Sequence, residues 1–377
     1  MLNRNSLFLL GVFLSIALSI GVLISTSKRV LQVPDTQHAE PSRDISLTPT
    51  TTPAFNPQLV SFEQLFSQST EWVATLSAQR LTTIIATGDV LPARTVNKLT
   101  SEKNDWLWPF ALTAEVLRSA DLTFINLETP LIRDCPIVLG GFTFCGDQRN
   151  VQGLLFAGVD VVTLANNHAN NYGVAGITET INLLEENEIS VVGIAGQPVL
   201  RQPKLHTFAF LGYNDVGVQP APIAAALPEQ VKSDIRAAKH VADVVIVQFH
   251  WGEEYRYQPT LRQQDLGHLA IDAGADVVIG NHPHWFQAVE RYGDGLIAYS
   301  HGNFVFDQEW SLETKQGIVG TYTFYDDTLI AVQYLPILIE DYGQAHFLQG
   351  EQKSQVIEKL RQESDLLRRH QSEPASP

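Results

Sequence analysis

The stretch that decides the fold reads Gly158-Val159-Asp160-Val161-Val162-Thr163-Leu164-Ala165-Asn166-Asn167-His168-Ala169-Asn170-Asn171-Tyr172-Gly173. A short apolar run rich in β-branched residues stops at two amides and an imidazole, and a Gly/Asn-rich turn follows. Buried parallel strands of α/β proteins have this form, because their carboxyl ends deliver polar side chains to the open edge of the sheet. The stretch therefore predicts a strand that ends in a functional turn.

The same pattern of an apolar run with a polar end recurs along the chain. Strands are predicted at 82–91, 121–128, 189–195, 243–250, 275–284 and 296–303. Helical spacing of apolar residues predicts helices over 174–188 and between His250 and Ala275. This alternation is typical of a layered α/β fold. Two further runs, 319–325 and 329–334, flank Asp326-Asp327 and predict an antiparallel hairpin.

The N-terminus, residues 1–29, predicts a membrane anchor. Leu7–Ile24 is an unbroken run of eighteen uncharged residues, and a membrane-spanning helix needs roughly 20, with about 17 as the lower bound. No Ala-x-Ala site follows, which favours an uncleaved signal anchor over a cleaved signal peptide. Orientation is poorly set by charge, because Arg4 faces Lys28-Arg29 across the span.

The remainder of the chain divides by composition into three segments. Residues 30–58 are rich in Pro, Thr and Ser and predict a flexible linker, since they hold too few large apolar groups to offset their ordering entropy. Residues 59–350 predict the globular domain, with a lead-in helix over 62–81. Residues 351–377 predict a C-terminal helix and a frayed tail.

The net charge and the cysteine content indicate which kinds of partner the chain can bind. The 377 residues carry a formal charge of −16, which argues against nucleic acid because phosphate binding needs a basic surface. An acidic chain with clustered histidines and carboxylates suits divalent cations instead. The two cysteines, Cys135 and Cys145, are too few for a four-cysteine zinc site. If the chain is exported, they can form one disulfide that closes a short loop.

The polar residues at the strand ends form a mixed oxygen and nitrogen ligand set without thiolate. They are Asp89, Glu128, Asn167, His168, His250, His282 and His284. Such a set suits manganese, iron or zinc, and the sequence does not choose among them. A carboxylate can bridge two ions ~3.5–4 Å apart, and a nearby imidazole can protonate a leaving group.

Each of these residues also has an ordinary structural interpretation. A single histidine at a strand end is more often structural than a ligand, and Asp89 or Glu128 alone could cap a helix or close a turn. Five of the eleven histidines follow apolar runs directly, however, which favours a joint metal site. A Ser-His-Asp triad that uses Ser300 is the lesser alternative, because no Gly-x-Ser-x-Gly turn accompanies it.

Six motifs, in order, resemble the bacterial capsule and poly-γ-glutamate biosynthesis proteins of CapA type, which are relatives of the calcineurin-like metallophosphoesterases. The motifs are Gly88-Asp89-Val90-Leu91-Pro92-Ala93-Arg94, Asn126-Leu127-Glu128, Ala165-Asn166-Asn167-His168, His250-Trp251-Gly252-Glu253-Glu254-Tyr255, Gly280-Asn281-His282-Pro283-His284 and Tyr299-Ser300-His301-Gly302-Asn303-Phe304-Val305-Phe306-Asp307. The resemblance runs from about Thr82 to Phe306. It implies a central β-sandwich flanked by helices.

The resemblance also implies roles for single residues. Asp89 resembles the first metal aspartate, Glu128 stands at the bridging position, Asn167 resembles the metal-binding Asn and His168 the catalytic imidazole that contacts the phosphoryl group. His250, His282 and His284 resemble the remaining imidazole ligands of the family. Arg94 and Glu254 are expected to bind substrate. Two departures matter: Leu91 stands where a histidine ligand is expected, and Glu128 replaces an aspartate. The first metal position is therefore expected to be weak or empty.

The leading functional hypothesis is a membrane-anchored, extracytoplasmic, metal-dependent hydrolase of capsule or poly-γ-glutamate biosynthesis. Its expected partners are one or two divalent ions, the exported anionic polymer, the membrane through a single N-terminal span, and other capsule-assembly membrane proteins. Two alternatives stay open. The chain could hydrolyse phosphate esters, or it could be a non-catalytic subunit that holds polymer during assembly.

Overall fold

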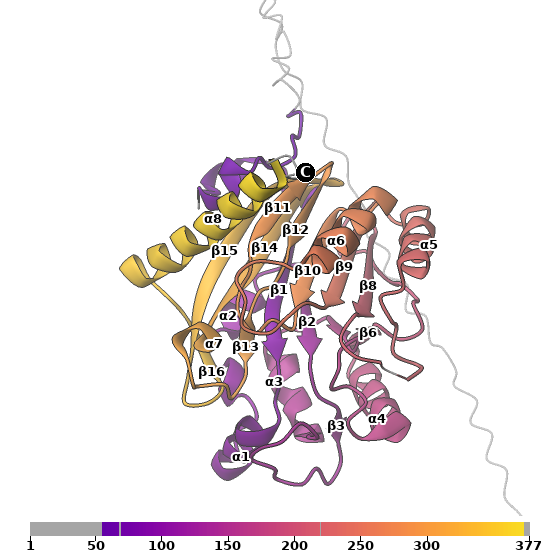
Figure 1. Cartoon of the computed structure of the whole chain (residues 1–377), viewed down its shortest axis with the longest axis vertical. Helices are drawn as coiled ribbons and strands as arrows, with labels where there is room; N and C mark the ends of the chain where they lie inside the picture. Colours follow the sequence, from indigo (N-terminus) through magenta and orange to yellow (C-terminus); the bar gives the residue numbers. More distant parts are fainter. Residues whose placement is uncertain (1–54, 68, 219, 373–377) are drawn as a thin grey trace, which may run out of the picture. The chain divides into compact units, whose positions relative to one another are not determined.

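The computed structural model describes residues 55–67, 69–218 and 220–372 (Figure 1). The chain from Phe55 onward forms one compact unit. The predicted anchor over Leu7–Ile24 and nearly all of the predicted linker lie outside the described residues. Among the residues that are described, no helix combines the length and apolar character needed to cross a membrane.

The described strands build two large sheets and one small pair. The first sheet has the order β16-β15-β14-β1-β2-β5-β6, with β13 also paired to β1. Its strands are β1 (Leu81–Val90), β2 (Leu122–Leu127), β5 (Val161–Thr163), β6 (Ser190–Val192), β13 (Asn303–Val305), β14 (Gln316–Tyr325), β15 (Thr328–Glu340) and β16 (Gln344–Phe347). Strands β1, β2, β5 and β6 run parallel, whereas β14, β15 and β16 add an antiparallel half.

The second sheet has the order β11-β12-β10-β9-β8-β7. Its strands are β7 (Val199–Arg201), β8 (Phe208–Asn214), β9 (Val244–His250), β10 (Val277–Asn281), β11 (Val289–Tyr292) and β12 (Gly295–Ala298). Strands β8, β9, β10 and β12 are parallel. A short parallel pair, β3 (Leu131–Ile132) and β4 (Gly146–Asp147), stands apart.

Helices cover the outer faces of both sheets (Figure 1). The α-helices are α1 (Arg94–Lys103), α2 (Ala114–Leu117), α3 (Val151–Phe156), α4 (Gly173–Glu186), α5 (Pro228–Lys239), α6 (Leu261–Ala273), α7 (Leu312–Lys315) and α8 (Gly350–Ser372). Short 3-10 turns are η1 (Glu63–Phe66), η2 (Glu71–Thr75), η3 (Trp108–Phe110) and η4 (Gln148–Asn150).

Side-chain alternation along the strands explains the layers. In β2, Phe124 points into the core between the sheets, where its ring lies 5.1 Å from that of Phe210 in β8, edge to face. Its neighbour Ile125 points the other way, into a core shared with α1, α3 and α4. A third core lies between the second sheet and α5 and α6. The fold is thus a mixed α/β sandwich flanked by helices, as the family resemblance implied.

Most predicted elements are present, but three expectations were wrong. The lead-in helix over 62–81 is instead the two short turns η1 and η2, in which only Leu65 is buried. The strand predicted over 189–195 ends at Val192, where Gly193 turns away with φ of +83°. The strand predicted over 296–303 is two strands, β12 and β13, which belong to different sheets.

The crossing between β12 and β13 matters for function. The segment Tyr299–Gly302 leaves the second sheet and enters the first, where Asn303 becomes the register partner of Asp89 in β1. The carboxyl ends of β1, β2 and β5 therefore lie at the same end of the sandwich as those of β9 and β10. Polar side chains from both sheets meet there.

Candidate metal centre

On the side of the first sheet, Asp89 lies at the end of β1 between two buried amides. Asn126 in β2 and Asn303 in β13 are its register partners. The Asn126 Nδ2 donates to Asp89 Oδ1 at 2.8 Å, which fixes the carboxylate rotamer. Glu128 follows β2 directly, and both carboxylates are fully buried.

On the side of the second sheet, three imidazoles follow neighbouring strands. His250 ends β9 and is in register with Asn281, the last residue of β10, which His282 and His284 follow closely. His282 and His284 adopt positive φ of 95° and 59°. Such backbone is costly for side chains with a Cβ and persists mainly where function requires it. The backbone N–H of His282 donates to Asp89 Oδ2 at 3.2 Å and so joins the two sheets.

These side chains converge in three overlapping groups. The groups are Glu128, His250 and His282; Asp89, Glu128 and His284; and Glu254, His282 and His284, with one ligand atom per residue and the atoms of each group within 4.8 Å of one another. Glu128 belongs to both of the fully buried groups. It therefore occupies the place of a carboxylate that two ions can share.

The electrostatics of Glu128 fit a cation in that place. Among the described residues, neither of its carboxylate oxygens has a hydrogen-bond partner, and the same holds for Nδ1 of His282. Burial, and then the neighbouring charge of Asp89, raises the pKa of the Glu128 carboxyl well above its ordinary value. A buried ionised carboxylate needs a compensating charge. A divalent cation between Glu128 and the imidazoles would supply it, so the residues present fit a metal ion.

Burial favours the neutral form of two of these imidazoles, His250 and His282, and the neutral form is the one that binds metals. Burial, followed by the charge of His284, lowers the pKa of His282 to about 3. The same cause lowers the pKa of His250 well below its ordinary value, with His282 as the next contribution. The donor set of carboxylate oxygens, imidazole nitrogens and an amide suits manganese, iron or zinc.

Asn166 and Asn167 make different contacts. The Asn166 side chain donates to Asn126 Oδ1 at 3.0 Å and accepts the backbone N–H groups of His168 and Ala169. These bonds end β5 and fix the turn. Asn167 Oδ1 lies 2.9 Å from His250 Nε2, at the first buried group.

His168 lies beside the metal-binding groups rather than within them. Its ring packs 4.4 Å from the ring of Phe144, and its Nδ1 is 3.2 Å from the amide nitrogen of Asn171. Burial, then the charge of His284, lowers its pKa to about 4, and contacts with Asn171 and the Phe142 carbonyl offset this only in part. The ring is therefore neutral at physiological pH.

The two predicted substrate-binding residues have different surroundings. Arg94 forms an ion pair with Asp307, and its guanidinium lies 5.0 Å from the ring of Phe144 and 5.5 Å from that of Phe306. The Arg94 guanidinium, expected to bind substrate, is thus already engaged by Asp307. Glu254 is exposed and belongs to the third group, at the rim of the site.

Comparison with known proteins shows the family to which the chain belongs. Residues 83–308 match the model of the bacterial capsule synthesis protein PGA_cap. The chain belongs to this family. It is 29% identical over 301 residues to the capsule biosynthesis protein CapA of Bacillus anthracis. This match covers 74% of this chain and 72% of that protein. It is 32% identical over 254 residues to the PGA biosynthesis protein CapA of Bacillus subtilis (strain 168), covering 62% of this chain and 65% of that one.

Among solved structures, the fold is similar to a phosphatase from Mycoplasma pneumoniae, with a TM-score of 0.47 and 13% identity, over 70% of this chain and 95% of that one.

Leu91 is one of the two departures from the phosphoesterase pattern. Leu91, where a histidine ligand was expected, is fully buried in the core under the helices, and its N–H donates to Val305 O. Its position thus offers the site no ligand. Instead His284 Nδ1 lies 3.2 Å from Asp89 Oδ2 and 2.9 Å from Asn303 Oδ1, so the second sheet supplies the imidazole of that group.

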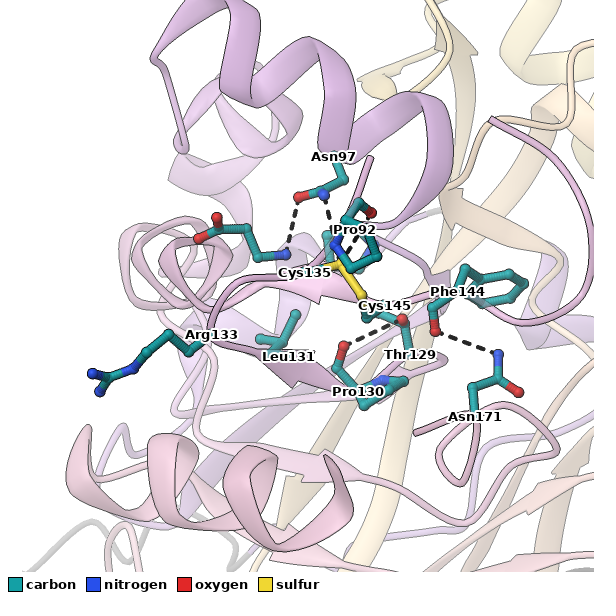
Figure 2. Close-up of a disulfide and its surroundings, with 12 residues drawn as sticks. Pro92, Asn97, Thr129, Pro130, Leu131, Arg133, Cys135, Phe144, Cys145 and Asn171 are labelled. Atoms are coloured by element: carbon teal, nitrogen blue, oxygen red, sulfur yellow. Dashed lines mark hydrogen bonds between the residues drawn. A yellow bond between two sulfur atoms is a disulfide. The ribbon is translucent and has the colours of Figure 1, made fainter. Parts of the chain in front are cut away.

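Asn126 and Asn303 lie in two of the quoted motifs but were not predicted as site residues. The alternative triad does not form: Ser300 Oγ accepts the Gly302 N–H, whereas His301 Nε2 contacts the hydroxyl of Tyr322 at 2.9 Å in the core. Cys135 and Cys145 are joined by a disulfide (Figure 2).

Proposed function

We propose that this chain is a divalent-metal-dependent hydrolase of capsule or poly-γ-glutamate biosynthesis that acts on the exported anionic polymer. The observation that carries the proposal is the buried Glu128 carboxylate, which lacks a hydrogen-bond partner among the described residues and is shared by two groups of metal-binding side chains. Membership of the PGA_cap family supports the class of substrate.

The residues that would hold the ion or ions are Asp89, Glu128, Asn167, His250, His282 and His284. A divalent ion held by these residues would supply Lewis-acid chemistry for a carbonyl or phosphoryl oxygen and would lower the pKa of a water molecule. Asn126 and Asn303 orient the Asp89 carboxylate and the His284 ring by direct hydrogen bonds. Such supporting contacts keep ligand geometry fixed before the ion arrives.

His168 and Arg94 would act on the substrate itself. His168, next to the groups and neutral, can hold a proton against a substrate oxygen. Arg94, held in an ion pair with Asp307, places its guanidinium, with its remaining N–H donors, beside Phe144, against which His168 packs. The chain carries a formal charge of −16, so an anionic polymer needs such a local attraction to bind.

The location we propose is the cell membrane, with a single N-terminal span and the site outside the cytoplasm, beside other capsule-assembly membrane proteins. The apolar run Leu7–Ile24 and the Cys135–Cys145 disulfide support this, since disulfides persist in oxidising compartments. Labelling Ala54→Cys with a membrane-impermeant maleimide in intact cells tests it. Labelling that occurs only after lysis would contradict the assignment.

The activity is tested on the full chain in detergent. We expect at least one tightly bound divalent ion per chain by elemental analysis, and release of short glutamate oligomers from poly-γ-glutamate. Both should be lost in His250→Ala and His282→Ala. Less than one ion per chain, unchanged in these variants, would refute the metal-dependent enzyme.

Hydrolysis of phosphate esters is the second candidate. It is favoured by the Asn167-His168 pair, which presents an amide at the buried group and an imidazole beside it, the arrangement expected from the phosphoesterase resemblance. Turnover of a generic phosphodiester that disappears in His168→Ala, without glutamate release, would favour it over the first. Bound metal with neither activity would favour a non-catalytic assembly subunit.

A further inference from the structure

The loop between Cys135 and Cys145 carries an exposed apolar surface. It contains no charged residue, and the side chains of Ile137, Leu139 and Phe142 are 50%, 59% and 83% exposed. We call these three side chains the loop patch. Large apolar side chains that gather on the surface of a globular domain mark places where another protein or a membrane binds. The loop patch is therefore a candidate docking surface.

The base of the loop is held by the rest of the domain, whereas its tip is open. At the base, β3 pairs with β4, and the disulfide joins residues ten positions apart (Figure 2). Gly146 N–H donates to Pro130 O at 2.9 Å. At the tip, a Cβ on Gly140 or Gly141 would meet no atom of the described residues within 4 Å. The loop patch thus has a fixed place on the domain and open space beside it.

The other side of the same loop packs against the candidate site. The buried ring of Phe144 lies 4.4 Å from the ring of His168 and 5.0 Å from the guanidinium of Arg94. Asn171, three residues after His168, donates from its Nδ2 to Phe142 O at 3.0 Å. A surface that binds the loop patch therefore lies next to the residues proposed to meet substrate.

The size and chemistry of the loop patch decide between classes of partner. A stable protein interface takes about 800 Å² and about 20–30 residues from each partner, and three side chains of one loop fall far short of that. A polyanion offers charged groups, which an uncharged apolar loop would desolvate without compensation. A phospholipid surface, in contrast, accepts single apolar side chains between its headgroups and acyl chains. Because the chain carries a formal charge of −16, zwitterionic lipids suit it better than anionic ones.

The length of the chain allows this end of the domain to reach a membrane that holds the apolar run Leu7–Ile24. The ring of Phe55, the first described residue, lies 5.0 Å from that of Tyr325, the register partner of Leu81 at the start of β1. The loop lies at the opposite end, beyond β2 and next to β3 (Figure 1). Residues 25–54 separate the two parts and can span at most about 100 Å. This exceeds the width of a unit of this length, whose radius of gyration is about 20 Å.

We propose that the loop patch inserts into the surface of a zwitterionic phospholipid membrane and turns the candidate metal centre toward the bilayer. The inference rests on the proposed membrane location, to which it adds the face of the domain that meets the lipid. Because Phe144 and Asn171 connect the loop to His168, the inserted loop holds the site beside the headgroups. The polymer then meets the site at the membrane surface.

The test uses the full chain, reconstituted in phosphatidylcholine vesicles with and without a lipid that carries a doxyl quencher on its acyl chain. The fluorophore NBD is attached to Leu139→Cys, since the two native cysteines are joined to each other. Leu205→Cys is the matched control. Leu205 is 58% exposed, close to the exposure of Leu139, and it follows Lys204, whose Nζ contacts Leu81 O at the other end of the domain.

We expect the doxyl lipid to lower the emission of the Leu139→Cys label at least about two-fold, because apolar groups at this depth lie about 5–10 Å into the headgroup boundary. The Leu205→Cys label should keep its emission. Adding Ile137→Ser and Phe142→Ser to Leu139→Cys should remove most of the quenching and leave the melting temperature nearly unchanged, because both side chains are exposed.

A label at position 139 that is quenched no more than the label at position 205 would overturn the inference, and so would quenching that persists in the two serine substitutions. Flotation of the vesicles separates this failure from that of the proposed location. A chain that floats with the vesicles without quenching at position 139 contradicts only the docking of the loop. A chain that does not float contradicts the membrane location, and the docking of the loop with it.

Discussion

Because Glu128 belongs to both buried groups, its replacement should change how much a bound metal stabilises the protein. Replacing Glu128 with Gln removes a ligand from both buried groups at once, whereas His284→Gln removes one from only one of the two buried groups and one from the group with the exposed Glu254. Without metal, Glu128→Gln should not lower the melting temperature, because burial already raises the pKa of this carboxyl and so favours its neutral form. With metal, the variant should lose the stabilisation that the wild type gains.

The expected size follows from linkage. An ion at 100 times its dissociation constant adds about 2.7 kcal/mol to the free energy of unfolding. For the unit Phe55–Pro377, an unfolding entropy of about 2.1 cal/mol/K per residue gives about 0.7 kcal/mol/K in total. Metal should therefore raise the melting temperature of the wild type by about 4 °C. The shift should fall below about 1 °C in Glu128→Gln and largely remain in His284→Gln.

The assay is calorimetry of the full chain in detergent, after chelation and then with added manganese, iron or zinc. Glu290→Gln is the control, because Glu290 is also a buried carboxylate, contacts the Tyr299 hydroxyl and His268, and belongs to none of the three groups. It should lower the melting temperature but keep the full metal shift. A Glu128→Gln protein that shifts as much as the wild type would refute the shared-ligand assignment.

Three further outcomes are expected. His168→Ala should lower kcat at least about 100-fold on whichever substrate is turned over, with bound metal unchanged by elemental analysis. Burial lowers the pKa of His301 from 6.5 to about 4, so as pH falls the imidazole is protonated in the unfolded chain before it is protonated in the folded one. The free energy of unfolding should therefore drop by roughly 3 kcal/mol between about pH 6.5 and 4. Urea titrations of His301→Gln should lack that part of the pH dependence. Replacing Cys135 and Cys145 by Ser should cost about 2–3 kcal/mol in the same titration, and an unchanged midpoint would show that the bond constrains little.

Much of the site followed from sequence because one rule places it. Parallel strands in a sheet end at the same edge, so polar residues after apolar runs must gather there. The rule predicted that Asp89, Asn167 and His250 would lie close together, without knowledge of which strands are neighbours. The family resemblance then added the order of the ligands.

The crossing at Tyr299–Gly302 could not be predicted by the same rule. Local periodicity reports which side chains are buried, but it does not report the partner strand. The run 296–303 is apolar throughout its first half, so one strand was the simplest interpretation. Only the pairing of β12 with β10, and of β13 with β1, reveals that the chain changes sheets.

The missed amides have the same cause. Asn126 and Asn303 look like residues that end strands or begin turns, since asparagine is common in both places. Their role depends on being the two register partners of Asp89, which is a property of three strands together. A pattern within one strand contains no such information.

The two buried groups also differ in the ligands that they offer. Leu91 contributes no ligand, although a histidine ligand was expected at its position. Glu128, His250 and His282 offer two imidazoles and one carboxylate, and Asn167 lies at hydrogen-bond distance from His250. The group with Asp89 offers two carboxylates but one imidazole, brought by His284 from the other sheet. Imidazole-rich sites favour zinc or iron, whereas oxygen-rich sites favour manganese or magnesium. A metal titration should therefore resolve two affinities, with the imidazole-rich group filling first when zinc is used.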